Sequence, residues 1–279
     1  MTEQASYTIG KLKITRLTEQ MFSVPQGKLF PTSGDELPAE QADMPVNMSV
    51  HSWLVETPNR IMLIDTATGN GKDRPFSPLF HQLNSPWMEN LTAAGIDPAD
   101  VDYVLHTHLH TDHVGWNTVP NGDSWIPTFP NATWVCPQAE VTFMTSPAAA
   151  VRRVVFDDSV QPIIDARRLV TLPDEITEYL PGIVFYPTPG HSPGHMSIAF
   201  VTEGETAIFL GDVMHSAIQV AHPQWNSMFC GNGPLAAESR RWLLEFAATE
   251  NATVFTSHFD RTSAGRITKD NDRFIWTFV

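Results

Sequence analysis

Apolar and polar residues alternate in the first part of the chain, and this alternation predicts strands. Residues 7–16 follow the pattern of one strand, and residues 53–57 and 60–65 predict a hairpin that turns at Pro58 and Asn59. Between them, residues 21–50 are rich in proline and show no regular period. A long irregular segment in a compact domain is usually functional or disordered, so we predict that residues 21–50 form a lid.

The rest of the chain predicts short apolar strands interleaved with helices. The expected strands are 101–105, 133–135, 183–186, 196–201, 207–210 and 253–256, and the expected helices are 86–95, 138–145, 159–166 and 235–249. No linker, repeat or shift in composition interrupts this order. It predicts a single α/β domain over residues 1–279, with two sheets packed face to face and helices outside.

Composition and charge narrow the partners that the chain can have. The formal net charge of -14 argues against nucleic acid and anionic membranes, because both need a basic face, and favours a small-molecule substrate. Two cysteines cannot form a disulfide framework. We expect a cytoplasmic protein, because neither a secretory signal nor a run of about 18 apolar residues is visible.

Side chains that bind metals follow directly after several of the predicted strands. They occur in His108-Leu109-His110-Thr111-Asp112-His113, at His191 after Pro189-Gly190, at Asp212 after Leu210-Gly211 and at His258 after Thr256-Ser257. Functional residues of α/β folds gather at such strand ends. Beyond the His108-X-His110 pair there are three further histidines and two aspartates, which makes coincidence a poor explanation.

The spacing of these residues predicts two metal ions. Zn²⁺ is the expected metal, because zinc is bound by about four imidazole nitrogens and carboxylate oxygens. His108, His110 and His191 are assigned to one ion. Asp112, His113 and His258 are assigned to the other, with Asp212 bridging the two. We expect Asp65 to orient a ligand imidazole and His106 to serve as a structural neighbour.

With this motif order, the chain resembles the metallo-β-lactamase superfamily over roughly residues 50–260. The resemblance implies a four-layer αββα sandwich with the dinuclear site at one edge. Asp212 stands where antibiotic-hydrolysing members carry cysteine. The chain is therefore more similar to the branch that holds N-acyl-homoserine lactonases and methyl parathion hydrolase. The resemblance to lactonases, which are often dimers, also implies that a homodimer is one possible oligomeric state.

Two metal ions about 3.5 to 4 Å apart activate water and polarise the bond that is attacked. We therefore predict a hydrolase of a small, largely apolar ester or lactone that uses a metal-bridging hydroxide as nucleophile. Asp112 is expected to pass a proton to the leaving alkoxide, and His215 to donate to the developing oxyanion or to pack.

Two other activities stay open. His215 occupies a position where many homoserine lactonases place a tyrosine, and the stretch from Gly211 to His215 is similar to methyl parathion hydrolase, which favours an organophosphate triester as the alternative substrate. Nitrogen and oxygen ligands also suit iron, so an iron-dependent oxidoreductase is the less favoured alternative.

Large apolar residues near the motifs predict a hydrophobic substrate pocket, since such sites have apolar walls with a few polar groups. The candidates follow His113 and His215 or lie in the predicted lid. They are Trp116, Trp225, Met228, Phe229, Phe22 and Phe30.

Overall fold

The computed structural model describes residues 5–279, which form two compact units. The first unit takes in the chain up to Gln20 and Val50–Asp174, and the second takes in Met21–Ser49 and Glu175–Val279. Strands β2 (Leu12–Pro25) and β3 (Pro45–Glu56) therefore contribute residues to both units. Each unit is described by itself below.

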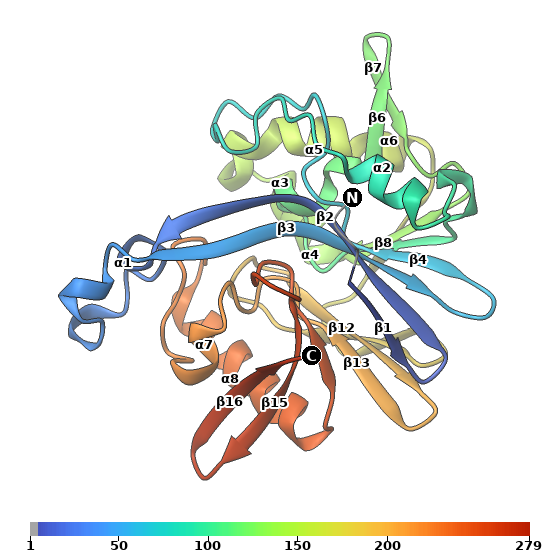
Figure 1. The fold of residues 1–279 in the computed structure, drawn as a ribbon. Coiled ribbons are helices and arrows are strands. Elements are labelled where there is room, and N and C mark those ends of the chain that lie inside the picture. The colour runs from blue at the N-terminus through green and yellow to red at the C-terminus, as the bar shows by residue number, and fades with distance from the viewer. Residues whose placement is uncertain (1–4) are drawn as a thin grey trace. The chain divides into compact units, whose positions relative to one another are not determined.

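A mixed sheet organises the first unit (Figure 1). Its strand order is β1-β2-β3-β4-β5-β8-β9, antiparallel from β3 to β4 and parallel from β4 through β9. The strands not yet located are β1 (Ser6–Ile9), β4 (Ile61–Ile64), β5 (Tyr103–Leu105), β8 (Thr133–Pro137) and β9 (Leu169–Leu172). A separate hairpin is formed by β6 (Thr118–Asn121) and β7 (Ser124–Pro127).

Short helices fill the connections of the first unit. They are α2 (Trp87–Ala93), α3 (Thr111–Val114), α4 (Gln138–Met144), α5 (Arg153–Ser159) and α6 (Gln161–Asp165), with 3-10 turns at Pro98–Asp100, Gly115–Asn117 and Pro147–Arg152. Helices α4 and α5 bury Met144, Val155 and Phe156 against Leu109 and Cys136. This apolar cluster supports the loop that follows β5, because Leu109 belongs to that loop.

A second mixed sheet organises the second unit (Figure 1). It consists, in spatial order, of β10 (Thr177–Leu180), β11 (Ile183–Pro187), β12 (Met196–Thr202), β13 (Glu205–Phe209), β14 (Thr253–Phe255), β15 (Ala264–Asp270) and β16 (Arg273–Phe278). Only β13 and β14 are parallel, and the connection between them contains the long helix α8 (Gly233–Thr249). A helical crossover is expected here, because two parallel neighbouring strands cannot be joined by a tight turn.

Helix α8 has the sequence features of a stable helix. The side chain of its N-cap, Asn232, accepts a hydrogen bond from the N–H of Leu235 at 3.3 Å, and Pro234 lies in the first turn. Leu243, Leu244 and Ala247 are fully buried against the sheet in a cluster with Ile208. Two shorter helices, α1 (Gln26–Leu29) and α7 (Ile218–Ala221), and 3-10 turns at Gly34–Glu36 and Ala39–Gln41 complete this unit.

The structure confirms most of the predicted elements and corrects four. Residues 7–16 are not one strand, because Gly10 takes a φ of 51° and turns the chain between β1 and β2. The predicted helix 159–166 is divided, since α5 ends at Ser159 and α6 begins at Gln161. Residues 264–267, for which no strand was predicted, lie in strand β15.

The prediction that residues 21–50 are irregular is wrong at both ends. Residues 21–25 continue β2 and residues 45–50 begin β3, so the connection is largely limited to 26–44. That connection is anchored, because Leu29 and Phe30 are fully buried in a cluster with Met48 and Trp225. Within residues 5–279, no helix has the length and apolar character needed to cross a membrane.

Candidate metal centre

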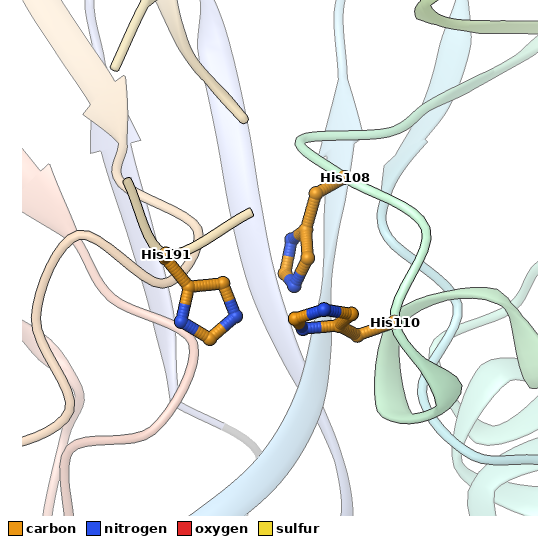
Figure 2. Close-up of side chains that lie close together, drawn as sticks. All are labelled: His108, His110 and His191. Carbon is orange, nitrogen blue, oxygen red and sulfur yellow. The ribbon is translucent and has the colours of Figure 1, made fainter. Parts of the chain in front are cut away.

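Strand β5 leads directly into the first group of metal-binding side chains. Residues 106–110 form a loop and α3 begins at Thr111, so Asp112 and His113 lie in its first turn. Figure 2 shows the imidazoles of His108 and His110 near each other, with ring centres 4.6 Å apart. The ring of His113 lies 4.1 Å from that of His108. The predicted cluster is therefore brought together on one loop of the first unit.

Asp65 at the end of β4 holds this loop in place. Its Oδ2 accepts hydrogen bonds from Nδ1 of His113 at 2.9 Å and from the hydroxyl of Thr107 at 2.8 Å. Its Oδ1 accepts the N–H of Thr107 at 2.9 Å and lies 3.3 Å from Nδ1 of His106. Burial opposes ionisation, but the imidazoles of His113 and His106 hold the pKa of Asp65 below its usual range. Asp65 thus orients His113 as expected.

Backbone bonds fix the loop against the turn that follows β4. The N–H of Thr66 donates to the carbonyl of His113 at 2.7 Å, and the N–H of Gly115 donates to the carbonyl of Ala67 at 2.7 Å. A Cβ on residue 115 would lie 1.7 Å from the carbonyl oxygen of Thr68. Only glycine therefore permits this close approach.

In the second unit, imidazoles surround the carboxylate of Asp212. Nε2 of His191 lies 3.2 Å from Oδ2, and Nε2 of His258 lies 3.0 Å from Oδ1. His191 follows β11 on the segment drawn in Figure 2, Asp212 follows β13, and His258 follows β14. Three separate strand ends thus direct donor atoms to one buried point, where each of the three residues is no more than 4% exposed.

Two neighbours fix the orientation of these donors. Nε2 of His195 accepts the backbone N–H of Asp212 at 2.8 Å, while its Nδ1 lies 2.9 Å from the hydroxyl of Thr188. Nδ1 of His258 donates to the carbonyl of Ser49 at 2.9 Å, which directs Nε2 to Asp212. His195 is therefore engaged through both ring nitrogens and supports the backbone at Asp212.

His215 also faces the carboxylate of Asp212. Its Nε2 lies 3.4 Å from Oδ2, and its ring is stacked on that of His258 with centres 5.5 Å apart. Burial lowers the pKa of His215, opposed by Asp212 and reinforced by His258 and Arg240. A neutral imidazole can act as a metal ligand or a hydrogen-bond donor. His215 was expected only as a catalytic or packing residue. The structure adds it to the residues that could hold a metal ion.

The predicted pocket residues are divided by burial. Phe30 is fully buried, and Trp225, only 2% exposed, packs on it. Trp116 is also buried and stacks on Trp87 with ring centres 5.4 Å apart. Met228 and Phe229 are 45% and 40% exposed, and the ring of Phe229 lies 5.5 Å from that of His215. Phe22, partly buried, packs against the cluster of Leu29, Phe30 and Trp225.

The donor set fits divalent metal ions. In the first unit, one donor atom from each of Asp65, His108 and His113 lies within 4.8 Å of the others, and the same holds for His191, Asp212 and His215 in the second. Imidazole nitrogens grouped around a carboxylate are the ligands that zinc takes in catalytic sites. Burying so many titratable groups together is costly without a cation to compensate the carboxylates.

Comparison with known proteins relates both units to one family. The model of the metallo-beta-lactamase superfamily matches residues 46–258. N-acyl homoserine lactonase AttM of Rhizobium radiobacter is 28% identical over 176 residues, which cover 61% of this chain and 63% of that protein. N-acyl homoserine lactonase of Bacillus thuringiensis is 24% identical over 252 residues, covering 86% of this chain and 93% of the relative.

Solved structures share the fold at low sequence identity. The hydrolase AbOPH of the beta lactamase superfamily superposes with a TM-score of 0.84 at 23% identity, covering 100% of this chain and 98% of that one. The dizinc quorum-quenching lactonase AidC gives a TM-score of 0.78 at 22% identity, covering 99% and 97%. The fold is thus α/β with two mixed sheets flanked by helices, and the chain belongs to the metallo-β-lactamase superfamily.

Proposed function

We propose that this chain is a dinuclear metal-dependent hydrolase of small, largely apolar esters or lactones. The observation that carries the proposal is the set of buried imidazole nitrogens 3.0 to 3.4 Å from the carboxylate of Asp212. The superfamily match supports it, because residues 46–258 include every proposed ligand from both units. The distant relationship to N-acyl homoserine lactonases supports an ester or lactone bond as the target.

The proposed ligands are those predicted from the sequence. His108, His110 and His191 would hold one ion, Asp112, His113 and His258 would hold the other, and Asp212 would contribute to both. A pair of zinc ions would activate a water molecule at neutral pH and polarise the carbonyl of the substrate.

The residues of the chain have defined roles around that chemistry. Asp65 keeps His113 in the tautomer that leaves Nε2 available as a ligand, since Nδ1 carries the proton donated to Asp65. Asp112 accepts the proton released by the attacking water and transfers it to the departing alkoxide, which is expected to contribute about 10²- to 10⁴-fold to the rate. His215 would donate to the oxygen on which negative charge develops, or would help to hold a metal ion together with His191 and Asp212.

The surroundings of His215 favour an apolar substrate. Phe229 lies beside His215, and Phe229 and Met228 both remain partly exposed, so they can contact an acyl or aryl group. An aryl phosphotriester has a similar apolar surface and the same need for an activated water. It is therefore the second candidate, favoured by the imidazole at position 215.

Metal analysis and a substrate panel test the proposal. Protein purified without added metal is analysed for zinc, manganese and iron, then assayed with homoserine lactones, aryl esters, aryl phosphotriesters and a thioester. We expect two zinc ions per chain and turnover of esters or lactones, and strongly lowered turnover in Asp112→Asn protein that has been loaded with both metals. Iron with oxygen consumption, or two zinc ions without any hydrolysis, would contradict it.

A further inference from the structure

Arg240 on α8 is a buried cation that binds backbone carbonyls. Its side chain is fully buried, its Nε donates to the carbonyl of Val213 at 3.0 Å and its Nη1 donates to the carbonyl of Pro223 at 2.6 Å. Among residues 5–279, no carboxylate lies within ion-pair distance of its guanidinium. Burial lowers the pKa of Arg240 to about 10, so it remains charged at neutral pH.

A buried guanidinium without a carboxylate costs free energy, and an apolar residue would fill the same space more cheaply. The two carbonyl groups that Arg240 binds indicate the role of this buried cation. Val213 immediately follows the proposed bridging ligand Asp212, and Pro223 lies in the loop that carries Trp225. Arg240 therefore ties the turn that presents Asp212 to the loop beside the predicted substrate region.

Gln219 makes a second connection between the same two segments. Its Oε1 accepts the backbone N–H of His215 at 2.7 Å, and its Nε2 donates to the carbonyl of Trp225 at 2.8 Å. The side chain of Gln219 is fully buried. Each segment is thus held twice, at Val213 and His215 on one side and at Pro223 and Trp225 on the other.

We infer that Arg240 and Gln219 are positioning residues that fix Asp212 and His215 relative to the 223–225 loop. The inference rests on the proposed function, because it assumes that Asp212 bridges the two metal ions. The donors of a metal site must keep their geometry within a fraction of an ångström, and residues that hold ligands in place change metal affinity about 10- to 100-fold when they are replaced. Neither residue needs to touch the substrate.

The test compares Arg240→Met and Arg240→Lys with Arg241→Met, which removes a charge from the exposed neighbour on the same helix. Zinc affinity is measured by competition with a chromophoric chelator, and unfolding of the metal-free proteins is followed in urea. We expect Arg240→Met to weaken zinc binding at least about tenfold and to lower kcat more than it raises KM. Arg240→Lys keeps the charge but not the paired donors, so it should lose less. Arg241→Met should match the wild type.

Equal zinc affinity in the wild type and both Arg240 variants would overturn the inference. Where Arg240→Met does not fold, the lysine variant decides, since it retains a buried cation. Gln219→Leu supplies an independent test, with the same direction expected for zinc affinity. A wild-type chain that binds no zinc would instead end the proposed function, so the two failures are distinguishable.

Discussion

The indole N–H of Trp116 donates to Oε1 of Glu19 at 2.9 Å and links the end of the histidine loop to strand β2. Glu19 is buried, and burial raises its pKa against the effect of its donors. Its carboxylate also accepts the N–H groups of Thr68 at 2.8 Å and Gly69 at 3.0 Å. One carboxylate thus joins β2 to both chain segments that shape the first group of metal ligands.

Replacing Glu19 with leucine should destabilise the first unit. The substitution leaves the donors of Trp116, Thr68 and Gly69 buried without an acceptor, which should lower the free energy of unfolding by about 3 kcal/mol. Urea unfolding measures the change. Glu89→Leu in α2 removes an exposed carboxylate and serves as the control. Similar stability of the two variants would contradict the role assigned to Glu19.

Replacing Asp65 with asparagine should weaken metal binding without unfolding the chain. Asparagine has one acceptor oxygen instead of two, so it cannot serve His113, Thr107 and His106 together. We expect the affinity for the zinc ion assigned to His113 to fall about 10- to 100-fold, measured by calorimetric titration of the metal-free protein. Asp123→Asn in the β6–β7 turn makes the same change in charge on the surface. Unchanged zinc affinity in Asp65→Asn would show that His113 keeps its orientation without the carboxylate.

Lys72 should make the stability of the chain depend on pH. Its Nζ donates to the hydroxyl of Thr118 at 2.6 Å and lies 3.5 Å from the centre of the Trp125 ring. Burial lowers the pKa of Lys72 from 10.5 to about 7, against the opposing effect of Asp158. Between these two values the unfolded chain binds the proton and the folded chain does not, so folding is increasingly favoured as pH rises.

The comparison with Lys72→Met isolates this contribution. From pH 7 to pH 9, the free energy of unfolding of the wild type should rise relative to that of the variant by about 2 kcal/mol. Urea unfolding of the metal-free proteins at pH 7, 8 and 9 provides the values. Parallel pH profiles for the two proteins would show that Lys72 keeps an ordinary pKa in the folded state.

Glu36 should hold the 26–44 connection to the loop that carries Trp225. Its Oε2 accepts hydrogen bonds from Nε1 of Trp225 at 2.8 Å and from Nε2 of Gln224 at 2.7 Å. These bonds lower the pKa of Glu36. Glu36→Leu should speed proteolytic cleavage within residues 31–44 several-fold while zinc content stays the same, because the proposed ligands lie elsewhere. Glu40→Leu is the matched control, and equal cleavage rates would remove this role from Glu36.

Local sequence patterns predicted the parts of the fold whose structure is set locally. The strands at 133–135, 183–186 and 253–256 and the helix at 235–249 are apolar runs of suitable length with clear ends, and the structure has each of them. Residues 21–25 and 45–50 escaped prediction because proline and polar residues conceal strands that are paired with distant parts of the chain. Strands that pair with distant parts of the chain need not show a regular alternation of apolar and polar residues in their own sequence.

The candidate site was predicted unevenly for a similar reason. Strand ends followed by histidine and aspartate identify the proposed ligands, and Asp65 could be added because it also ends a strand. Glu19, Gln219 and Arg240 carry no such signal, because their importance comes from carbonyls, N–H groups and an indole brought to them by folding. The metal ligands and the substrate pocket stay predictions until metal and substrate are measured.

The contact between Gly115 and the carbonyl of Thr68 limits how the histidine loop can be transplanted. A designer who copies residues 106–117 into another scaffold would import a strip of backbone that fits only against its own counterpart, the turn at residues 65–69. Both segments must therefore be transferred together. The transferred segments include Asp65, which orients His113. Libraries that randomise position 115 should return glycine alone.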